Sequence, residues 1–339
     1  MSFCYSLASG KLSSCHTVFR CPPARMFAVL SLVALVAAGS AWAETIGFGV
    51  NSRGNSVDPQ QVNALWRINL LDGEVDYVGW TGYLDLEAIA LDPAGTLYGA
   101  DDESKTMVRV SQVTGLAVPV GGVANRSNMG QSLLQGMDFG MDFDCQGTAW
   151  VVSDVQQSLF QADMESGRLT RIGERGSLGA PITDIAIRGQ RVYGIGVGMT
   201  GSGSAAAPNL YRVDLDNASA ELIGPLGDAV SPYNNAGLAF DADGNLWAIT
   251  DRRATPAGDF PSEILRIDTQ TGSAEKVAET IIGVESLAIA TPAACDVDDN
   301  HGGLPVSATA VSVLTPPWMG LLILLMLAVG LVQVALRRS

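Results

Sequence analysis

Histidine is almost absent from this sequence. The chain of 339 residues contains only His16 and His301, and both lie outside the repeated region that makes up most of its length. The repeated region therefore lacks the imidazole needed for a Ser-His or Cys-His nucleophile, a histidine general base, or a His-rich zinc or copper site. The Gly-rich stretches contain no lysine and follow no strand-to-helix pattern, which excludes phosphate-binding loops. Most familiar hydrolase mechanisms are excluded.

Basic residues are also scarce. The chain has 20 Lys and Arg against 35 Asp and Glu, and its formal net charge is −15. Every acidic residue follows Ala43, so the chain beyond that point is more acidic still. Such a surface repels nucleic acid and anionic lipid headgroups and suits solubility outside the cytoplasm. Nucleic acid is therefore excluded as a partner.

The first 43 residues resemble a secretory signal peptide with a long n-region. Residues 26–43 read MFAVLSLVALVAAGSAWA, an apolar stretch preceded by Arg20 and Arg25 and closed by a small-x-small pattern. Signal peptidase cuts after such a pattern, which places cleavage between Ala43 and Glu44. The sequence thus predicts an N-terminal signal helix and an exported chain.

Export would leave only two of the five cysteines, Cys145 and Cys295, in an oxidising compartment. Both fall at the same end of their repeat units, so a disulfide bond between them is one prediction. Two unpaired thiols in separate turns are the alternative.

Residues 44–290 repeat a two-hairpin pattern. Its first half pairs two apolar runs across a D-x-x-G turn, as in LEAIALDPAGTLYGA from Leu86 and GLAFDADGNLWAI from Gly237. The second half reads ILRIDTQTGSAEKVA from Ile264, and copies of the whole unit recur about 42 to 54 residues apart along the sequence. Four short strands in each copy are typical of a propeller blade.

The two ends of this region complete one further blade. GVESLAIA, from Gly283 to Ala290, is a first strand with no second, while TIGFGVNS, from Thr45, is a second strand with no first. Pairing them closes a ring and covers the edges that an open sheet would expose. The sequence therefore predicts an all-β fold, a five-bladed β-propeller closed by strands from both termini.

The motif apolar-A-x-D-x-x-G-x-L-aromatic, followed by L-x-R-I-D-x-x-T-G, resembles the blades of WD-repeat, NHL and YVTN-type bacterial propellers. The resemblance covers nearly the whole of residues 44–290 and implies the fold rather than a function. The Trp-Asp and Gly-His signatures of true WD repeats are absent.

Long connections gather on one predicted face of the propeller. The turns between first and second strands and between third and fourth strands are short, whereas the other connections are long: 52–63, 122–134, 198–208, 225–234 and 251–262. We call the end of the ring that carries them the long-loop face and the opposite end the plain face. Loops of this kind often carry binding sites, although they are also tolerated as insertions. Tyr83, Tyr233 and Phe260 lie in loops of the long-loop face and are the aromatic candidates for ligand contact.

Carboxylate or amide oxygens recur near the start of every innermost strand. They are Glu87, Asp138, Asp184, Asn235 and Glu285. Converging on the axis, they would form a Ca²⁺ site, as in propellers similar to gluconolactonases. The alternative is that polar residues simply begin these strands, in which case no cofactor is implied.

The C-terminal segment changes character after the repeats. Residues 291–317 are rich in Pro, Gly, Asp and Ser and are predicted to be a linker, and residues 318–336 form an uncharged apolar run long enough to span a bilayer as a helix. Arg337 and Arg338 make the last stretch, residues 337–339, basic and predict a cytoplasmic end. The tail from Val311 resembles the IPTL and PEP types of sorting signal processed by exosortase-class enzymes, which implies the cell envelope of a Gram-negative bacterium.

Three functions are compatible with these features. The first is a membrane-anchored binding module that presents its long-loop face to an envelope or extracellular protein or glycan. The second is a calcium-dependent, lactonase-like hydrolase that uses the carboxylate ring. The third is a purely structural surface protein. The scaffold and the lack of histidine favour the first.

Overall fold

The described chain consists of short antiparallel strands joined by tight turns, and it contains no helix. The computed structural model describes residues 45–52, 61–130, 138–198, 208–254 and 258–289, all of which belong to one compact unit. No helix long and apolar enough to cross a membrane occurs among these residues. The predicted signal helix, linker, transmembrane span and sorting tail lie outside them, and so remain predictions.

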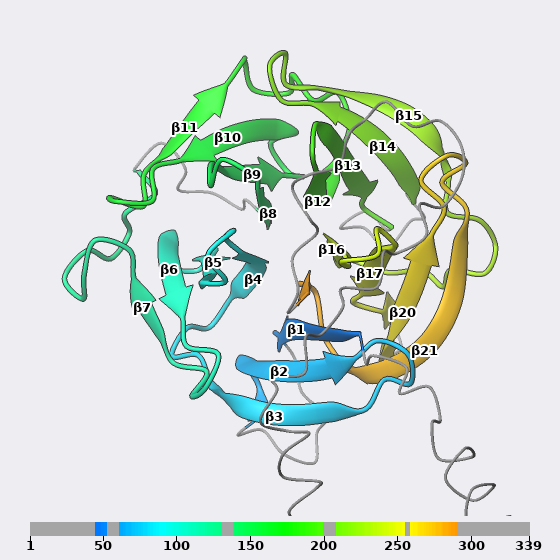
Figure 1. Cartoon of the computed structure of the whole chain (residues 1–339), viewed down its shortest axis with the longest axis horizontal. Helices are drawn as coiled ribbons and strands as arrows, with labels where there is room; N and C mark the ends of the chain where they lie inside the picture. The colour runs from blue at the N-terminus through cyan, green and yellow to red at the C-terminus, as the bar shows by residue number, and fades with distance from the viewer. Residues whose placement is uncertain (1–44, 53–60, 131–137, 199–207, 255–257, 290–339) are drawn as a thin grey trace, which may run out of the picture. The chain divides into compact units, whose positions relative to one another are not determined.

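Five four-stranded sheets form a ring around a central axis (Figure 1). Blade A contains β22 (Ala288–Ile289), β1 (Ile46–Asn51), β2 (Ala64–Asn69) and β3 (Val75–Trp80). Blade B contains β4 (Leu86–Leu91), β5 (Leu97–Asp101), β6 (Thr106–Val110) and β7 (Ala117–Pro119). Blade C contains β8 (Phe139–Phe143), β9 (Ala149–Ser153), β10 (Ser158–Ala162) and β11 (Leu169–Ile172). Blade D contains β12 (Ile182–Arg188), β13 (Arg191–Gly196), β14 (Asn209–Asp214) and β15 (Ser219–Pro225). Blade E contains β16 (Ala236–Phe240), β17 (Leu246–Thr250), β20 (Pro261–Ile267) and β21 (Ala274–Ile282).

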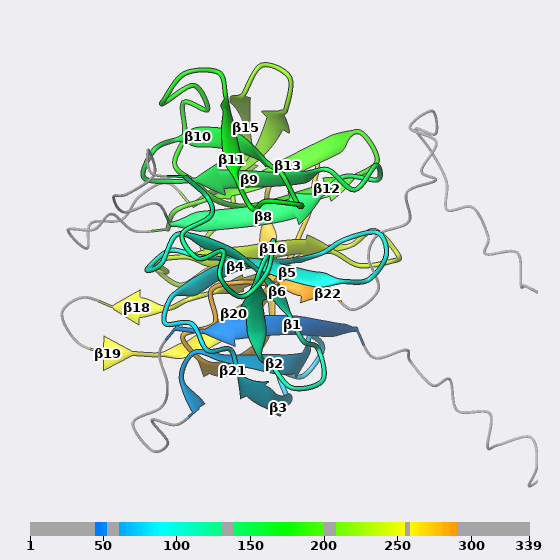
Figure 2. The same ribbon diagram turned by 90° about the vertical axis from the view of Figure 1, so that its left-hand side faces the viewer.

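The ring is closed by strands from both ends of the propeller. In blade A, β1 pairs with β22 through Gly47↔Ile289 and Phe48↔Ala288, and an isolated bridge joins Asn51 to Val284. The predicted all-β, five-bladed propeller is thus confirmed. A further two-stranded hairpin, β18 (Arg253–Ala254) and β19 (Gly258–Asp259), interrupts blade E and projects from the long-loop face (Figure 2).

The repeated D-x-x-G motif forms the turn between the first and second strands. In blade C the carboxylate of Asp144 accepts hydrogen bonds from the backbone N–H groups of Gln146 and Thr148 at 3.0 and 2.8 Å. Its other oxygen accepts the indole N–H of Trp150 at 3.0 Å, and Asp241 accepts that of Trp247 at 2.8 Å in blade E. One aspartate therefore forms the turn and also orients the aromatic residue of the second strand.

Neighbouring innermost strands approach each other backbone to backbone near the axis. A methyl group on Gly140 would overlap Thr183 and Asp184 of the next blade, and one on Gly237 would overlap Ser286 and Leu287. Small residues are needed at these positions because the strands converge there. This packing sets the separation of the side chains that lie at either end of the axis.

Candidate functional site

Five carboxyl groups gather on the long-loop face where blades B and C meet. We call them the acidic cluster, and they are Asp85, Glu87, Asp102, Asp138 and Asp154. Asp85 immediately precedes β4 and Asp102 immediately follows β5, and the N–H of Asp102 donates to the carbonyl of Asp85 at 2.8 Å. Asp138 and Asp154 occupy the equivalent positions before β8 and after β9. Each blade therefore contributes a facing pair of aspartates, and Glu87 adds a carboxyl group from within β4.

The carboxyl groups are close enough to share a cation. One oxygen from each of Asp85, Glu87 and Asp102 lies within 4.8 Å of the others. Glu87 is only 6 % exposed, and its Oε2 accepts the N–H of Phe139 at 2.9 Å. Its carboxyl group is also hydrogen-bonded to that of Asp138. The cluster therefore brings carboxyl oxygens of blades B and C together.

Burial and mutual repulsion raise the pKa values of the cluster. The pKa of Asp85 is raised to about 6. Burial is the main cause, followed by the charges of Asp102, Asp101 and Asp138. Burial and the charge of Asp138 raise the pKa of Asp154 to about 8. The pKa of Glu87 lies well above its usual range, because of burial and then the charge of Asp138.

A single lysine offsets part of this negative charge. Burial raises the pKa of Asp138, while its bond to Glu87 and the charge of Lys105 lower it. The Lys105 ammonium group forms an ion pair with the Asp102 carboxylate and donates to its carbonyl oxygen at 2.5 Å. An additional positive charge placed among the five carboxyl groups would therefore be strongly favoured.

The predicted axial ring of five ligands is only partly gathered. Glu87 and Asp138 are in contact, and Glu285 lies near enough for its charge to raise the pKa of Glu87. Asp184 instead accepts the backbone N–H groups of Leu238 and Ile185 at 2.6 and 2.9 Å, which links blade D to blade E. The amide oxygen of Asn235 accepts the Thr183 hydroxyl at 3.1 Å. The five-residue metal site therefore stays a prediction.

The sequence analysis did not identify three members of the acidic cluster, Asp85, Asp102 and Asp154. A periodic signal was present for two of them, because Asp102 and Asp154 each lie four residues after the aromatic residue of a second strand, Tyr98 and Trp150. No comparable signal marks Asp85. The position of Asp85 opposite Asp102 depends on the irregular register between β4 and β5, where the pairing shifts between Leu86 and Ala88.

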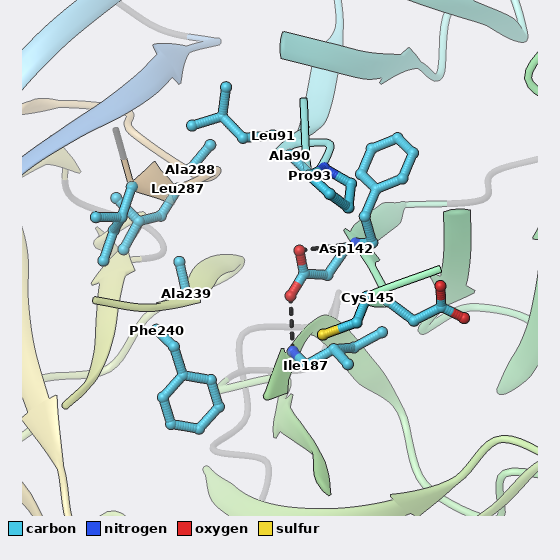
Figure 3. A pocket seen from close by; sticks show the side chains of 13 residues that line it. Ala90, Leu91, Pro93, Asp142, Cys145, Ile187, Ala239, Phe240, Leu287 and Ala288 are labelled. Atoms are coloured by element: carbon cyan, nitrogen blue, oxygen red, sulfur yellow. Dashed lines mark hydrogen bonds between the residues drawn. The ribbon is translucent and has the colours of Figure 1, made fainter. Parts of the chain in front are cut away.

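Buried carboxylates also join neighbouring blades on the plain-face side. Asp142, which replaces a small residue of the innermost strand, accepts the N–H of Phe143 at 2.8 Å and that of Ile187 in blade D at 2.6 Å. Burial raises the pKa of Asp142 to about 7. Both oxygens of this buried carboxylate are therefore satisfied by backbone donors (Figure 3).

Of the three aromatic residues predicted to contact a ligand, only Phe260 presents its ring to solvent. It is 39 % exposed and lies 5.2 Å from the guanidinium group of Arg252. Tyr83 and Tyr233 are buried, and the Tyr233 hydroxyl donates to the carbonyl of Gly196 at 2.5 Å. Their loops fold back over the blades, so these two rings extend the hydrophobic core.

Two exposed aliphatic side chains flank the acidic cluster. Leu84, 65 % exposed, directly precedes Asp85, and Val155, 51 % exposed, directly follows Asp154. Apolar side chains beside a desolvated charged centre are a common composition of protein interfaces.

Two of the predicted processing features fall outside the described residues. They are the cleavage site at Ala43 and Glu44 and the second cysteine, Cys295. Cys145 is described, and it takes part in a disulfide bond. Its pairing with Cys295 stays a prediction at this point.

Comparison with known proteins assigns no family. No protein-family profile matches the chain, and no curated protein matches it. Among solved structures, the chain resembles one from work on the de novo evolutionary emergence of a symmetrical protein shaped by folding constraints. The identity is 13%, the TM-score is 0.42, and the alignment covers 74% of this chain and 99% of that one. It also resembles the hydrazine synthase of Kuenenia stuttgartiensis at 14% identity and a TM-score of 0.35, with 64% of this chain and 60% of that chain covered. At this level of likeness neither structure bears on the activity of the chain.

Proposed function

We propose that the protein is an exported, membrane-anchored binding module whose long-loop face captures a positively charged group at the acidic cluster. The observation that carries this proposal is the convergence of Asp85, Glu87 and Asp102 within 4.8 Å, with Asp138 and Asp154 beside them. The predicted signal peptide and C-terminal apolar segment favour a location of this face outside the cytoplasm.

The charge balance supports a cationic ligand. Lys105 pairs with one carboxylate of the cluster, and the other carboxyl groups have raised pKa values because they are buried and, to a smaller extent, because their negative charges repel one another. A bound cation replaces the protons that otherwise relieve this repulsion. The cation is either a divalent ion such as Ca²⁺, which prefers carboxylate oxygens, or the lysine or arginine side chain of a protein partner.

Two titrations of the full-length chain in mild detergent distinguish these sources. Calcium chloride is added in one and a short lysine-containing peptide in the other, and both are followed by calorimetry and by thermal unfolding at pH 8. A ligand at about 100 times its dissociation constant adds about 2.7 kcal/mol to the free energy of unfolding, which raises the midpoint by several degrees. Stabilisation by calcium alone identifies an ion site, and stabilisation by the peptide alone identifies a basic partner.

The test variant is Glu87→Gln. A glutamine amide can still accept from Phe139 N–H, so the variant keeps this contact but can no longer ionise to bind a cation. It should bind the cation at least tenfold more weakly. Glu165→Gln, an exposed carboxylate in the turn between β10 and β11, makes the same charge change elsewhere and should bind normally. Equal affinity in the two variants, or no binding of either probe to the unaltered chain, would refute the proposal.

The lactonase-like hydrolase is the second candidate, and the contact of Glu87 with Asp138 beside Glu285 favours it. Paired carboxyl groups with separated protonation states can supply a general acid and a base. This candidate requires calcium-dependent hydrolysis of a lactone probe by the full chain, lost in Glu87→Gln. Calcium binding without hydrolysis would leave the binding module as the function.

A further inference from the structure

A pocket of about 320 Å³ lies on the outer part of blade B, where its strands β5, β6 and β7 meet blade C. Its wall consists of Tyr98, residues 118–123 and Met164, which lies in the turn between β10 and β11. This wall is largely apolar, and its one charged side chain is that of Arg109 in β6, which is exposed to solvent. The pocket shares no residue with the acidic cluster, and its volume is at the lower end of that of small-molecule sites.

Arginine recurs at this position of the third strand in other blades, and there an acidic residue faces it. The facing pairs in blades A, D and E are Arg67↔Asp76, Arg212↔Glu221 and Arg266↔Glu275. In blade E the Arg266 guanidinium group binds the Glu275 carboxylate at 2.9 Å. The repeat therefore shows that a carboxylate from the neighbouring strand is a partner that suits this arginine.

Blade B lacks the facing carboxylate. Val118 of β7 lies opposite Arg109, so an apolar wall stands where the other blades carry an acid. None of the residues that the structure describes forms an ion pair with Arg109. Asp163, in the adjacent turn of blade C, instead accepts the N–H of Glu165 and the hydroxyl of Ser166 within its own turn. Arg109 is thus open to a carboxylate from outside the chain.

We propose that this pocket binds a small carboxylic acid with an apolar body. The carboxylate takes the place of the acid that blade B lacks, and the planar guanidinium group of Arg109 binds it through two parallel hydrogen bonds. The apolar body lies against Val118, Pro119 and Met164. Burial of this body supplies most of the affinity, because an exposed ion pair contributes little by itself.

Tyr98 offers a second polar contact beside the arginine. It faces Arg109 across the pairing of β5 with β6. Burial, and then the charge of Asp92, raises the pKa of Tyr98, while the charge of Arg109 lowers it. The hydroxyl group is therefore protonated at neutral pH and can donate a hydrogen bond to a carboxylate oxygen. The pocket should accordingly select an acid over its uncharged amide.

The test is arginine modification by butanedione in the full-length chain in mild detergent, with the rate at each arginine measured by mass spectrometry. The probes are phenylbutyrate and octanoate, at up to about 10 mM because ligands of this size bind weakly. At least one acid should slow the modification of Arg109 at least fivefold. The matching amides should not slow it, and Arg266 should react at the same rate throughout. Failure of both acids to protect Arg109, or equal protection by the amides, would overturn the proposal.

A peptide arm distinguishes a small acid from the C-terminus of a protein, which also carries a carboxylate beside an apolar side chain. The probe is acetyl-glycyl-phenylalanine with a free carboxylate. Protection of Arg109 by this peptide and by neither small acid would replace the small acid with a protein partner and overturn the proposal as stated.

Val118→Glu gives blade B the acid that the other blades carry. An internal ion pair with Arg109 should then form, so that Arg109 reacts slowly without any ligand and the acids protect it no further. Val118→Gln adds a side chain of the same size without the charge and should leave Arg109 reactive. Val118 is only partly buried, so both variants should fold, which their unfolding midpoints check. Undiminished protection by phenylbutyrate or octanoate in Val118→Glu would show that the acid does not bind opposite Arg109.

Discussion

At the residue scale, single aspartates define the repeats of this protein. Asp144 and Asp241 hold a turn through one oxygen and an indole N–H through the other, which explains why the D-x-x-G motif and the aromatic residue of the second strand recur together. This link is local in sequence, since Trp247 lies six residues after Asp241. Local links of this kind are the reason that the blades were predictable.

Trp247→Phe tests the contribution of this bond. Both Trp247 and Asp241 are buried, so the loss of the indole N–H removes a bond to a charged acceptor while leaving most of the packing. We expect the free energy of unfolding to fall by about 1.5 to 3 kcal/mol, measured by urea denaturation. Trp80→Phe changes an exposed tryptophan and should alter stability by less than about 0.5 kcal/mol. Equal losses in the two variants would contradict this role.

The acidic cluster was less predictable than the blades for a physical reason at the same scale. Glu87 and Asp138 could be named because they occupy repeated positions near strand starts. Asp85 and Asp102 meet through the pairing of two strand ends at an irregular register, and Tyr83 is buried because its loop folds back over blade B. Register shifts and loop paths depend on tertiary packing, which a periodic pattern does not contain.

At the element scale, the spacing of innermost strands depends on residues without side chains. Gly237 of β16 lies against the backbone of Ser286 and Leu287, just before β22. Gly237→Ala should therefore push blade E away from the closing strand and cost at least about 2 kcal/mol of stability by chemical denaturation.

Gly227→Ala separates crowding from backbone strain. Gly227 has a φ of +89°, and no atom lies within 4 Å of the point where an alanine methyl group would sit. Alanine there costs only the strain of a left-handed conformation, about 1 kcal/mol. A smaller loss in Gly237→Ala than in Gly227→Ala would show that the innermost strands can adjust their separation freely.

At the scale of the whole molecule, buried carboxyl groups should make the protein more stable in mild acid than at neutral pH. The folded-state pKa values of Asp85, Asp142 and Asp154 are raised to about 6, 7 and 8. In the unfolded chain an aspartate has a pKa of about 3.9, so the folded state binds more protons between about pH 4 and pH 8. The free energy of unfolding therefore falls as pH rises through this window.

Thermal unfolding in a chelating buffer should accordingly show a midpoint that declines from pH 5 to pH 8. Asp142→Asn removes one of the responsible groups away from the acidic cluster. It should be less stable than the unaltered chain at pH 5, because one of its two backbone N–H partners loses an acceptor, and its midpoint should change less with pH. A midpoint that rises between pH 5 and pH 8 would contradict the assignment of raised pKa values.

The closure of the ring by β1 and β22 imposes an order on folding. Phe48 and Ala288 are neighbours in blade A but are separated by nearly the whole length of the propeller in sequence. Because contacts of such long sequence separation form late, the blade that holds the first residues of the propeller is completed last. Until the final strand is in place, β1 has an unpaired edge, and the incompletely folded chain is exposed to strand exchange and aggregation. A chain exported as we propose therefore needs protection of one strand edge for the full duration of its translocation.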